Sequence, residues 1–203
     1  MGFYTKATLK TEIRALLKEP TELFFLDTEI EGWIDQAAVD ISMKTLCYES
    51  IDTVTLVSGT IEYSVPTDTI KIYGCSNSND GMIKIHPRNL AHITEVTSGA
   101  PKYYYHFADK LGFYPIASAT GSVSVYSSKI TNDITDIPDE YQPYAISFGM
   151  WKAKLKDDKF SQANAYLVQY LNSLIFHRQD LYERGVDSKD MAKVPDRTVI
   201  AEK

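Results

Sequence analysis

Hydrophobic residues near the start of the chain recur at three- and four-residue intervals, which is the period of an α-helix. Leu9 and Ile13 share one face in this way, and the pattern predicts a short helix over residues 8–18. Thr8 is the expected N-cap, and Pro20 marks the end of the run. The segment that follows, Leu23-Phe24-Phe25-Leu26, is entirely apolar, so we expect it to pack inward.

A longer stripe with the same period predicts a second helix over residues 28–48. Thr28 and Glu31 have the spacing of a capping box at its start. The stripe consists of Ile30, Trp33, Ile34, Ala37, Ala38 and Ile41. Trp33 lies in the middle of the stripe, and we expect it to be buried.

At Asp52 the period changes from 3.6 to 2, the alternation of a half-buried strand. Residues 53–57 and 61–65 both alternate and are separated by Ser58-Gly59, which predicts a β-hairpin. Further strands are expected at 70–73, 82–85, 102–107, 110–114 and 123–127, with one or two helical turns at 89–96.

The helical period returns at Pro138, a residue suited to the first turn of a helix. Asp139 and Glu140 beside it would complement the helix dipole. This helix should reach residue 155, and a last one should run from 160 to 184 and stop at Gly185.

The order of elements predicts an α+β fold. Residues 1–51 and 131–185 supply the N- and C-terminal helices of one helical bundle, and residues 52–130 form a β-rich insertion domain. Residues 186–203 contain few large apolar side chains and form an extended C-terminal arm.

Composition places the chain among ordinary globular proteins. It has 203 residues, 44% hydrophobic, and a formal net charge of −6, so no overall basic field indicates nucleic-acid binding. Fourteen tyrosines are an unusual number, and tyrosine suits wet interfaces. No signal peptide and no apolar run of the ~20 residues that span a bilayer are evident, so we expect synthesis in a cytoplasm and no membrane partner.

Candidate chemistry is sparse. The histidines at 86, 92, 106 and 177 lack metal-ligand spacing, and Cys47 and Cys75 belong to no CxxC pair, so we expect two buried thiols and no metal or cofactor. The carboxylate pairs Asp139/Glu140 and Asp157/Asp158 are adjacent residues rather than a pair facing across a cleft. We therefore expect no catalytic residue and no enzymatic activity.

Tyr103, Tyr104 and Tyr105 form the densest aromatic cluster, flanked by Lys102 and His106. Aromatic and cationic residues together can stack the bases of single-stranded nucleic acid. Alternation in a strand sends Tyr104 to one face and its two neighbours to the other. We therefore favour a half-buried strand whose outward tyrosines meet a neighbouring subunit.

Four features in this order resemble the head-to-tail adaptor (connector) proteins of tailed phages. They are the helix at 28–48, the segment Thr55–Pro66, the run Gly99–Tyr105 with Leu111–Pro115, and Ile137–Tyr141 opening a helix. Together they cover roughly residues 27–180.

The resemblance implies a ring of about twelve copies under the portal that extends the DNA channel toward the tail. The partners would be the portal protein, a downstream tail or nozzle protein, other copies of the chain, and double-stranded DNA that passes without sequence-specific binding. It also implies a place in the virion at the head-tail junction. Some members of this class degrade cell wall, which makes a virion-associated cell-wall hydrolase the alternative function.

The C-terminal arm has an apolar minority that a partner could order on binding. The resemblance implies that this partner is the portal. The arm residues concerned are Lys189, Lys193, Val194, Pro195, Arg197, Val199 and Ile200.

Overall fold

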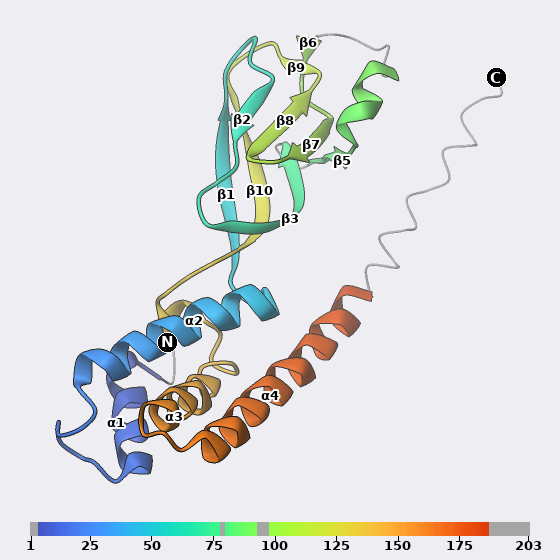
Figure 1. The fold of residues 1–203 in the computed structure, drawn as a ribbon. Helices are drawn as coiled ribbons and strands as arrows, with labels where there is room; N and C mark the ends of the chain where they lie inside the picture. Colours follow the sequence, from blue (N-terminus) through green and yellow to red (C-terminus); the bar gives the residue numbers. More distant parts are fainter. Residues whose placement is uncertain (1–3, 78–79, 93–97, 187–203) are drawn as a thin grey trace. The chain divides into compact units, whose positions relative to one another are not determined.

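The computed structural model describes residues 4–77, 80–92 and 98–186 (Figure 1). The chain divides into two compact units. The helical unit consists of residues up to Thr45 and from Asn132 onward, and the β unit consists of Leu46–Thr131. Helices and strands are both present, so the predicted α+β class is confirmed.

The helical unit is built from segments far apart in the sequence. Its elements are α1 (Lys6–Leu17), α2 (Asp27–Thr45), the 3-10 turn η2 (Ile134–Asp136), α3 (Tyr144–Lys156) and α4 (Phe160–Val186). The helices α2 and α3 pack against each other, and each also packs against α1 and α4. The last helix therefore runs one residue beyond the glycine that was expected to stop it.

The core of this unit follows the predicted stripe on α2, with one correction. Five α2 side chains have no exposed surface: Ile30, Ile34, Ala37, Ala38 and Ile41. Trp33 is only partly covered, because at 100° per residue it lies at the edge of that stripe. Its ring meets Phe25 edge-on, with centroids 6.1 Å apart.

The helix starts differ from the predicted caps. Thr5 caps α1: its hydroxyl accepts the Thr8 N–H at 3.2 Å, and the Thr8 hydroxyl accepts the Thr5 N–H at 2.7 Å. Thr8 is therefore the N3 residue of a capping box rather than the N-cap. At the start of α2, Glu29 and not Glu31 reaches back, accepting the Leu26 N–H at 3.0 Å.

The predicted helix start at Pro138 is wrong. Tyr141 N–H donates to the Pro138 carbonyl at 2.9 Å in a turn, and α3 begins only after Pro143, its N-cap. A proline inside a helix removes a hydrogen bond and clashes with the preceding turn. Because Pro143 cannot lie inside the helix, the helix starts at the next residue, Tyr144. Asp139 and Glu140 therefore precede α3.

The β unit contains two four-stranded sheets. One has the order β1-β10-β3-β4, and the other β2-β8-β7-β5, while β6 and β9 form a short parallel pair. The strands are β1 (Glu49–Leu56), β2 (Glu62–Ser64), β3 (Thr69–Asn77), β4 (Asp80–Gly81), β5 (Ile83–Lys84), β6 (Ser98–Gly99), β7 (Tyr103–Phe107), β8 (Lys110–Tyr114), β9 (Ile116–Ala117) and β10 (Gly121–Lys129). A 3-10 turn, η1 (Pro87–His92), covers part of the predicted helical segment, and residues 93–97 lie outside the described ranges.

The predicted hairpin between residues 53–57 and 61–65 is wrong. The turn exists, with Gly59 at φ 80°, but β1 pairs with β10 and β2 pairs with β8. Tyr63 holds the turn, its hydroxyl accepting the Val57 N–H at 2.9 Å. Leu56 and Phe113, from the two different sheets, share one core, so the turn carries the chain from one sheet to the other.

Candidate functional site

The segment between α1 and α2 turns its hydrophobic side chains outward. Leu23 is 79% exposed, Phe24 51% and Leu26 48%, whereas Phe25 is buried. The expectation that all four pack inward was therefore wrong for three of them. We call residues 21–26 the apolar loop.

Glu19 fixes the backbone of the apolar loop. One of its carboxylate oxygens accepts the N–H groups of Leu23, Phe24 and Phe25 at 2.8, 2.8 and 3.0 Å. These bonds, that to Phe25 foremost, hold the pKa of Glu19 below its usual range, although partial desolvation opposes them. Three backbone donors that would otherwise need water or a strand partner are satisfied by a single side chain.

Arg14, buried on α1, closes the other side of the loop. Its guanidinium donates to the carbonyls of Phe25, Thr21 and Glu19 at 3.0, 3.2 and 3.3 Å. It also donates through Nε to Asp27 at 2.8 Å and forms a second, shorter bond to the same carboxylate. A guanidinium suits this position because its planar array of five N–H donors can reach several acceptors at once.

Lys156 ties the loop to the end of α3. Its ammonium donates to the Phe24 carbonyl at 2.8 Å and to Glu29 at 2.6 Å. It also lies 4.8 Å from the centroid of the Phe24 ring, a cation–π distance. The ion pair with Lys156 lowers the pKa of Glu29, with a further contribution from the Leu26 N–H.

These contacts give the apolar loop one defined conformation. A loop whose backbone is already ordered loses little conformational entropy when its side chains meet a partner. Exposed apolar side chains gathered on such a loop are typical of an interaction surface.

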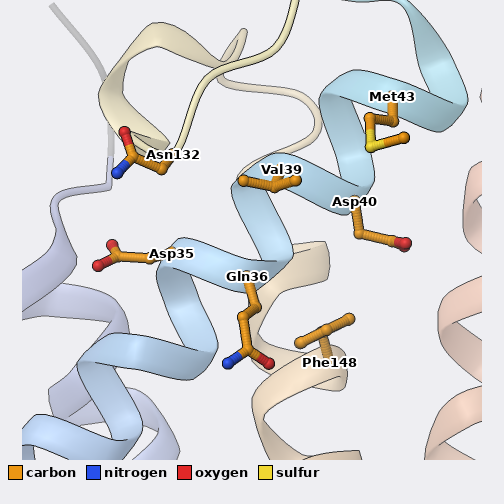
Figure 2. Close-up of a pocket in the computed structure, with 7 residues that line it drawn as sticks. All are labelled: Asp35, Gln36, Val39, Asp40, Met43, Asn132 and Phe148. Carbon is orange, nitrogen blue, oxygen red and sulfur yellow. The ribbon is translucent and has the colours of Figure 1, made fainter.

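A second feature of the helical unit is a hollow on α2, here called the α2 pocket (Figure 2). It has a volume of about 310 Å³, is open to solvent and has a mostly apolar lining. It is lined by Asp35, Gln36, Val39, Asp40, Met43, Asn132 and Phe148.

Two carboxylates are among the residues that line the pocket. Asp35 pairs with Lys6 at 2.5 Å, and Asp40 pairs with Lys44 at 2.7 Å. The Tyr170 hydroxyl on α4 also donates to Asp40 at 2.6 Å, and burial together with this bond raises the pKa of Tyr170. The lining of the pocket thus combines apolar side chains with two carboxylates.

Among the described residues, no group of three or more His, Cys, Asp or Glu side chains could hold a metal ion. Cys47 and Cys75 are both buried, and desolvation raises the pKa of Cys75 to about 12. His86 accepts the backbone N–H of Arg88 at 3.2 Å, while the side chains of His92 and His177 lie outside the described residues.

The adjacent carboxylate pairs serve helix ends and turns. Asp157 is the C-cap residue of α3 and pairs with Lys159 at 2.6 Å, and Asp158 has φ 54° in the same turn. Asp139 and Glu140 lie in the turn before α3. None of the four lines the α2 pocket, and adjacent positions do not give the facing geometry of a glycosidase pair.

The sequence model of the SU10 adaptor protein family matches residues 4–194, which include both units. The chain belongs to the SU10 adaptor protein family. This is a family of phage head-tail adaptors, so the resemblance seen in the sequence is confirmed. None of the curated proteins compared with the chain matches it.

Membership makes the adaptor a bacteriophage structural protein with a role in tail assembly. The family implies interaction with portal and tail proteins at the head-tail junction of the virion. Over the part of the chain that the structure describes, no helix is both long and apolar enough to cross a membrane.

Two of the three tyrosines in the cluster of the adaptor are buried inside the β unit. Tyr104 and Tyr105 are only 2% and 4% exposed. Tyr104 belongs to the core between the sheets, while Tyr105 lies over Gly112 and donates to Glu62 at 2.9 Å. Desolvation raises the pKa of each to about 12. Tyr103 alone of the three retains appreciable exposed surface, so neither a stacking platform nor an interface can use all three in this conformation.

The remaining predicted site residues of the adaptor belong to the C-terminal arm. Residues 187–203 lie outside the described ranges, so the structure places none of the seven arm residues. The sequence reasoning missed the apolar loop and the α2 pocket. The signal that could have found the loop is Arg14, a single arginine on the helix before an apolar run flanked by Glu19 and Asp27.

Proposed function

We propose that the chain is a ring-forming subunit that binds the portal and extends the DNA channel from the head to the next tail component. The match of the adaptor family over residues 4–194 carries this proposal. In the ring, about twelve copies would surround the passing double-stranded DNA, their helical ends forming one bundle in each copy. A net charge of −6 per copy suits a wall along which DNA slides without being held.

Within this arrangement we assign the C-terminal arm to the portal and the β unit to the next tail component. The arm joins apolar residues such as Val194 and Ile200 to the cations Lys189, Lys193 and Arg197, a composition suited to a segment that orders on binding. The family match also extends to residue 194, into the arm. Tyr103 is the residue of the cluster with surface left for a subunit or tail contact.

Co-sedimentation with purified portal rings of the same phage tests portal binding. We expect the protein to sediment with the portal, and a protein that stays in the supernatant at micromolar concentrations would contradict the proposal. A zymogram on bacterial cell wall separates this function from the hydrolase alternative. We expect no clearing, because the chain belongs to a family of phage structural proteins.

Removal of residues 186–203 tests the assignment of the arm. The truncation removes only the last residue of α4 and leaves the rest of the helices and both sheets in place, so we expect an unchanged melting temperature. Affinity for the portal should fall at least tenfold, or about 1.4 kcal/mol, in a binding titration. A truncated protein that binds the portal with full affinity would move the portal contact to the helical unit or the β unit.

A further inference from the structure

We propose that the apolar loop of one copy inserts into the α2 pocket of a neighbouring copy. The inference rests on the ring assembly in the proposed function and names the surfaces that would join one subunit to the next. It depends on two features that the described part of a single chain leaves open, namely three exposed hydrophobic side chains on a fixed loop and an apolar hollow on a helix.

A loop cannot fill the pocket of its own chain. The loop is attached to the first residue of α2 through Arg14 and Asp27, while Val39 and Met43 lie much farther along the same helix. At 1.5 Å per residue, the thirteen positions from Leu26 to Val39 span roughly 20 Å. Lys156 and Glu19 hold the loop at that end, so only the loop of another copy can reach the pocket.

The two surfaces match in size and polarity. A volume of about 310 Å³ is at the lower end of the range of pockets that hold ligands, and it suits one or two large side chains rather than a helix. Phe24 and Leu23 are the most exposed hydrophobic side chains of the loop. Val39, Met43 and Phe148 supply apolar lining for them.

Their charges match as well. Lys156 lies 4.8 Å from the centroid of the Phe24 ring, so a ring that enters the pocket brings this cation, with its partner Glu29, toward the lining carboxylates Asp35 and Asp40. Both carboxylates have surface ion-pair partners, and such pairs are worth only about 0–1 kcal/mol, so the two lysines can rearrange at little cost while Asp40 keeps its hydrogen bond from Tyr170. Glu22, the acidic residue of the loop, accepts a hydrogen bond from the backbone N–H of Asp27.

The contact is heterologous, because the loop and the pocket are different surfaces of the same unit. Each copy then offers its loop to one neighbour and its pocket to the other. Heterologous contacts generate a closed ring when the rotation between copies closes. A self-complementary contact between two identical patches would instead produce a two-fold dimer.

Cysteine cross-linking between two differently tagged full-length variants, mixed and assembled on purified portal rings, tests the inference. One variant carries Phe24→Cys and the other Met43→Cys, both at positions that are about half exposed, so the substitutions should not disturb the core. The native Cys47 and Cys75 are buried and should react slowly. The matched control pairs Phe24→Cys with Val168→Cys, an exposed apolar position on α4.

We expect the mixed Phe24→Cys and Met43→Cys sample to give at least ten times more cross-linked heterodimer than the control pair. Equal yields, or equally efficient linking of Phe24→Cys with itself, would overturn the inference. The pair Leu23→Cys and Val39→Cys repeats the test should either first variant fail to fold. Wild-type protein that binds portal while neither pair cross-links would overturn this contact alone, whereas loss of portal binding would overturn the proposed function.

Discussion

The two units of the chain treat their aromatic segments in opposite ways. In the β unit, Tyr104 and Tyr105 are drawn inside, because the ladder of β7 and β8 satisfies their backbone and leaves the side chains to pack. In the helical unit the apolar loop has no strand partner, and Arg14 and Glu19 satisfy its backbone instead. Once side chains rather than a sheet bind the backbone, the hydrophobic residues of that segment can face solvent.

Because of this difference, we expect the β unit to contribute mainly to the stability of the chain and the apolar loop mainly to its contacts with partners. The β unit is held by a closed apolar core, so changes there should lower the free energy of unfolding. The apolar loop is held by charged side chains around a surface with exposed hydrophobic residues, so changes there should alter contacts and local order more than global stability. The predictions that follow are ordered by the size of the expected effect.

Gly112→Ala should produce the largest loss. A Cβ at Gly112 would lie 2.0 Å from Cζ of Tyr105, inside its ring, so the buried tyrosine must leave its place. Overpacking of this kind costs typically 1–3 kcal/mol, and we expect about 3 kcal/mol by denaturant titration.

Gly149→Ala in α3 is the matched control for this change. Its Cβ would meet Cδ1 of Ile13 at 2.6 Å, the mobile end of a side chain, and alanine favours a helix by about 1 kcal/mol over glycine. We expect a net change within about 1 kcal/mol. Equal losses of unfolding free energy for the two variants would show that the two cores tolerate an added methyl group equally well.

Arg14→Ala should cost about 2 kcal/mol, because it leaves loop carbonyls and the Asp27 carboxylate without their donor. The sharper readout is hydrogen exchange at the amides of Leu23, Phe24 and Phe25, which should speed up in the variant. Lys10→Ala removes another partner of Asp27 but no bond to the loop, so it should leave these amides protected. Unchanged exchange in Arg14→Ala would mean that the loop is ordered by other contacts.

How far the sequence predicts this molecule differs between its two units. Hydrophobic periodicity located the helices because the signal is local, and Ile30, Ile34 and Ile41 are buried as predicted. Strands were located for the same reason, but their pairing was not: β1 lies next to β10, 65 or more positions away in the chain. Nothing in the alternation of 53–57 and 61–65 distinguishes a hairpin from a crossing between two sheets.

The candidate site was harder to predict than the fold. The outward turn of Phe24 depends on Arg14, Glu19 and Lys156, which come from three separate places in the sequence. A pattern of apolar residues alone predicts burial. The tyrosine cluster shows the converse, because Tyr105 is covered only through the absence of a side chain at Gly112 on the next strand.

Acid should loosen the apolar loop while the β unit stays intact. Glu19, Asp27 and Glu29 all have lowered pKa values in the folded chain, so their contribution is complete above the unfolded values of about 4 and is lost as the pH falls through the lower folded ones. The raised pKa of Tyr105 acts in the opposite direction: its contribution is complete below about pH 10 and is lost as the pH rises toward about 12. The protection factors of the Leu23, Phe24 and Phe25 amides, which are corrected for the intrinsic pH dependence of exchange, should fall between pH 6 and pH 3. A loop whose protection is the same at pH 3 as at pH 6 would contradict this origin of its order.

Electron microscopy of portal rings incubated with the purified protein tests the central claim, that this chain is a structural adaptor which assembles on the portal. Because ring contacts form cooperatively on a template and each copy carries a charge of −6, we expect the protein alone to be a monomer or small oligomer. Mixed with portal, it should add a closed ring of density to one end of each particle. Portals that remain bare at saturating protein, or a stable ring formed by the protein without portal, would contradict the account.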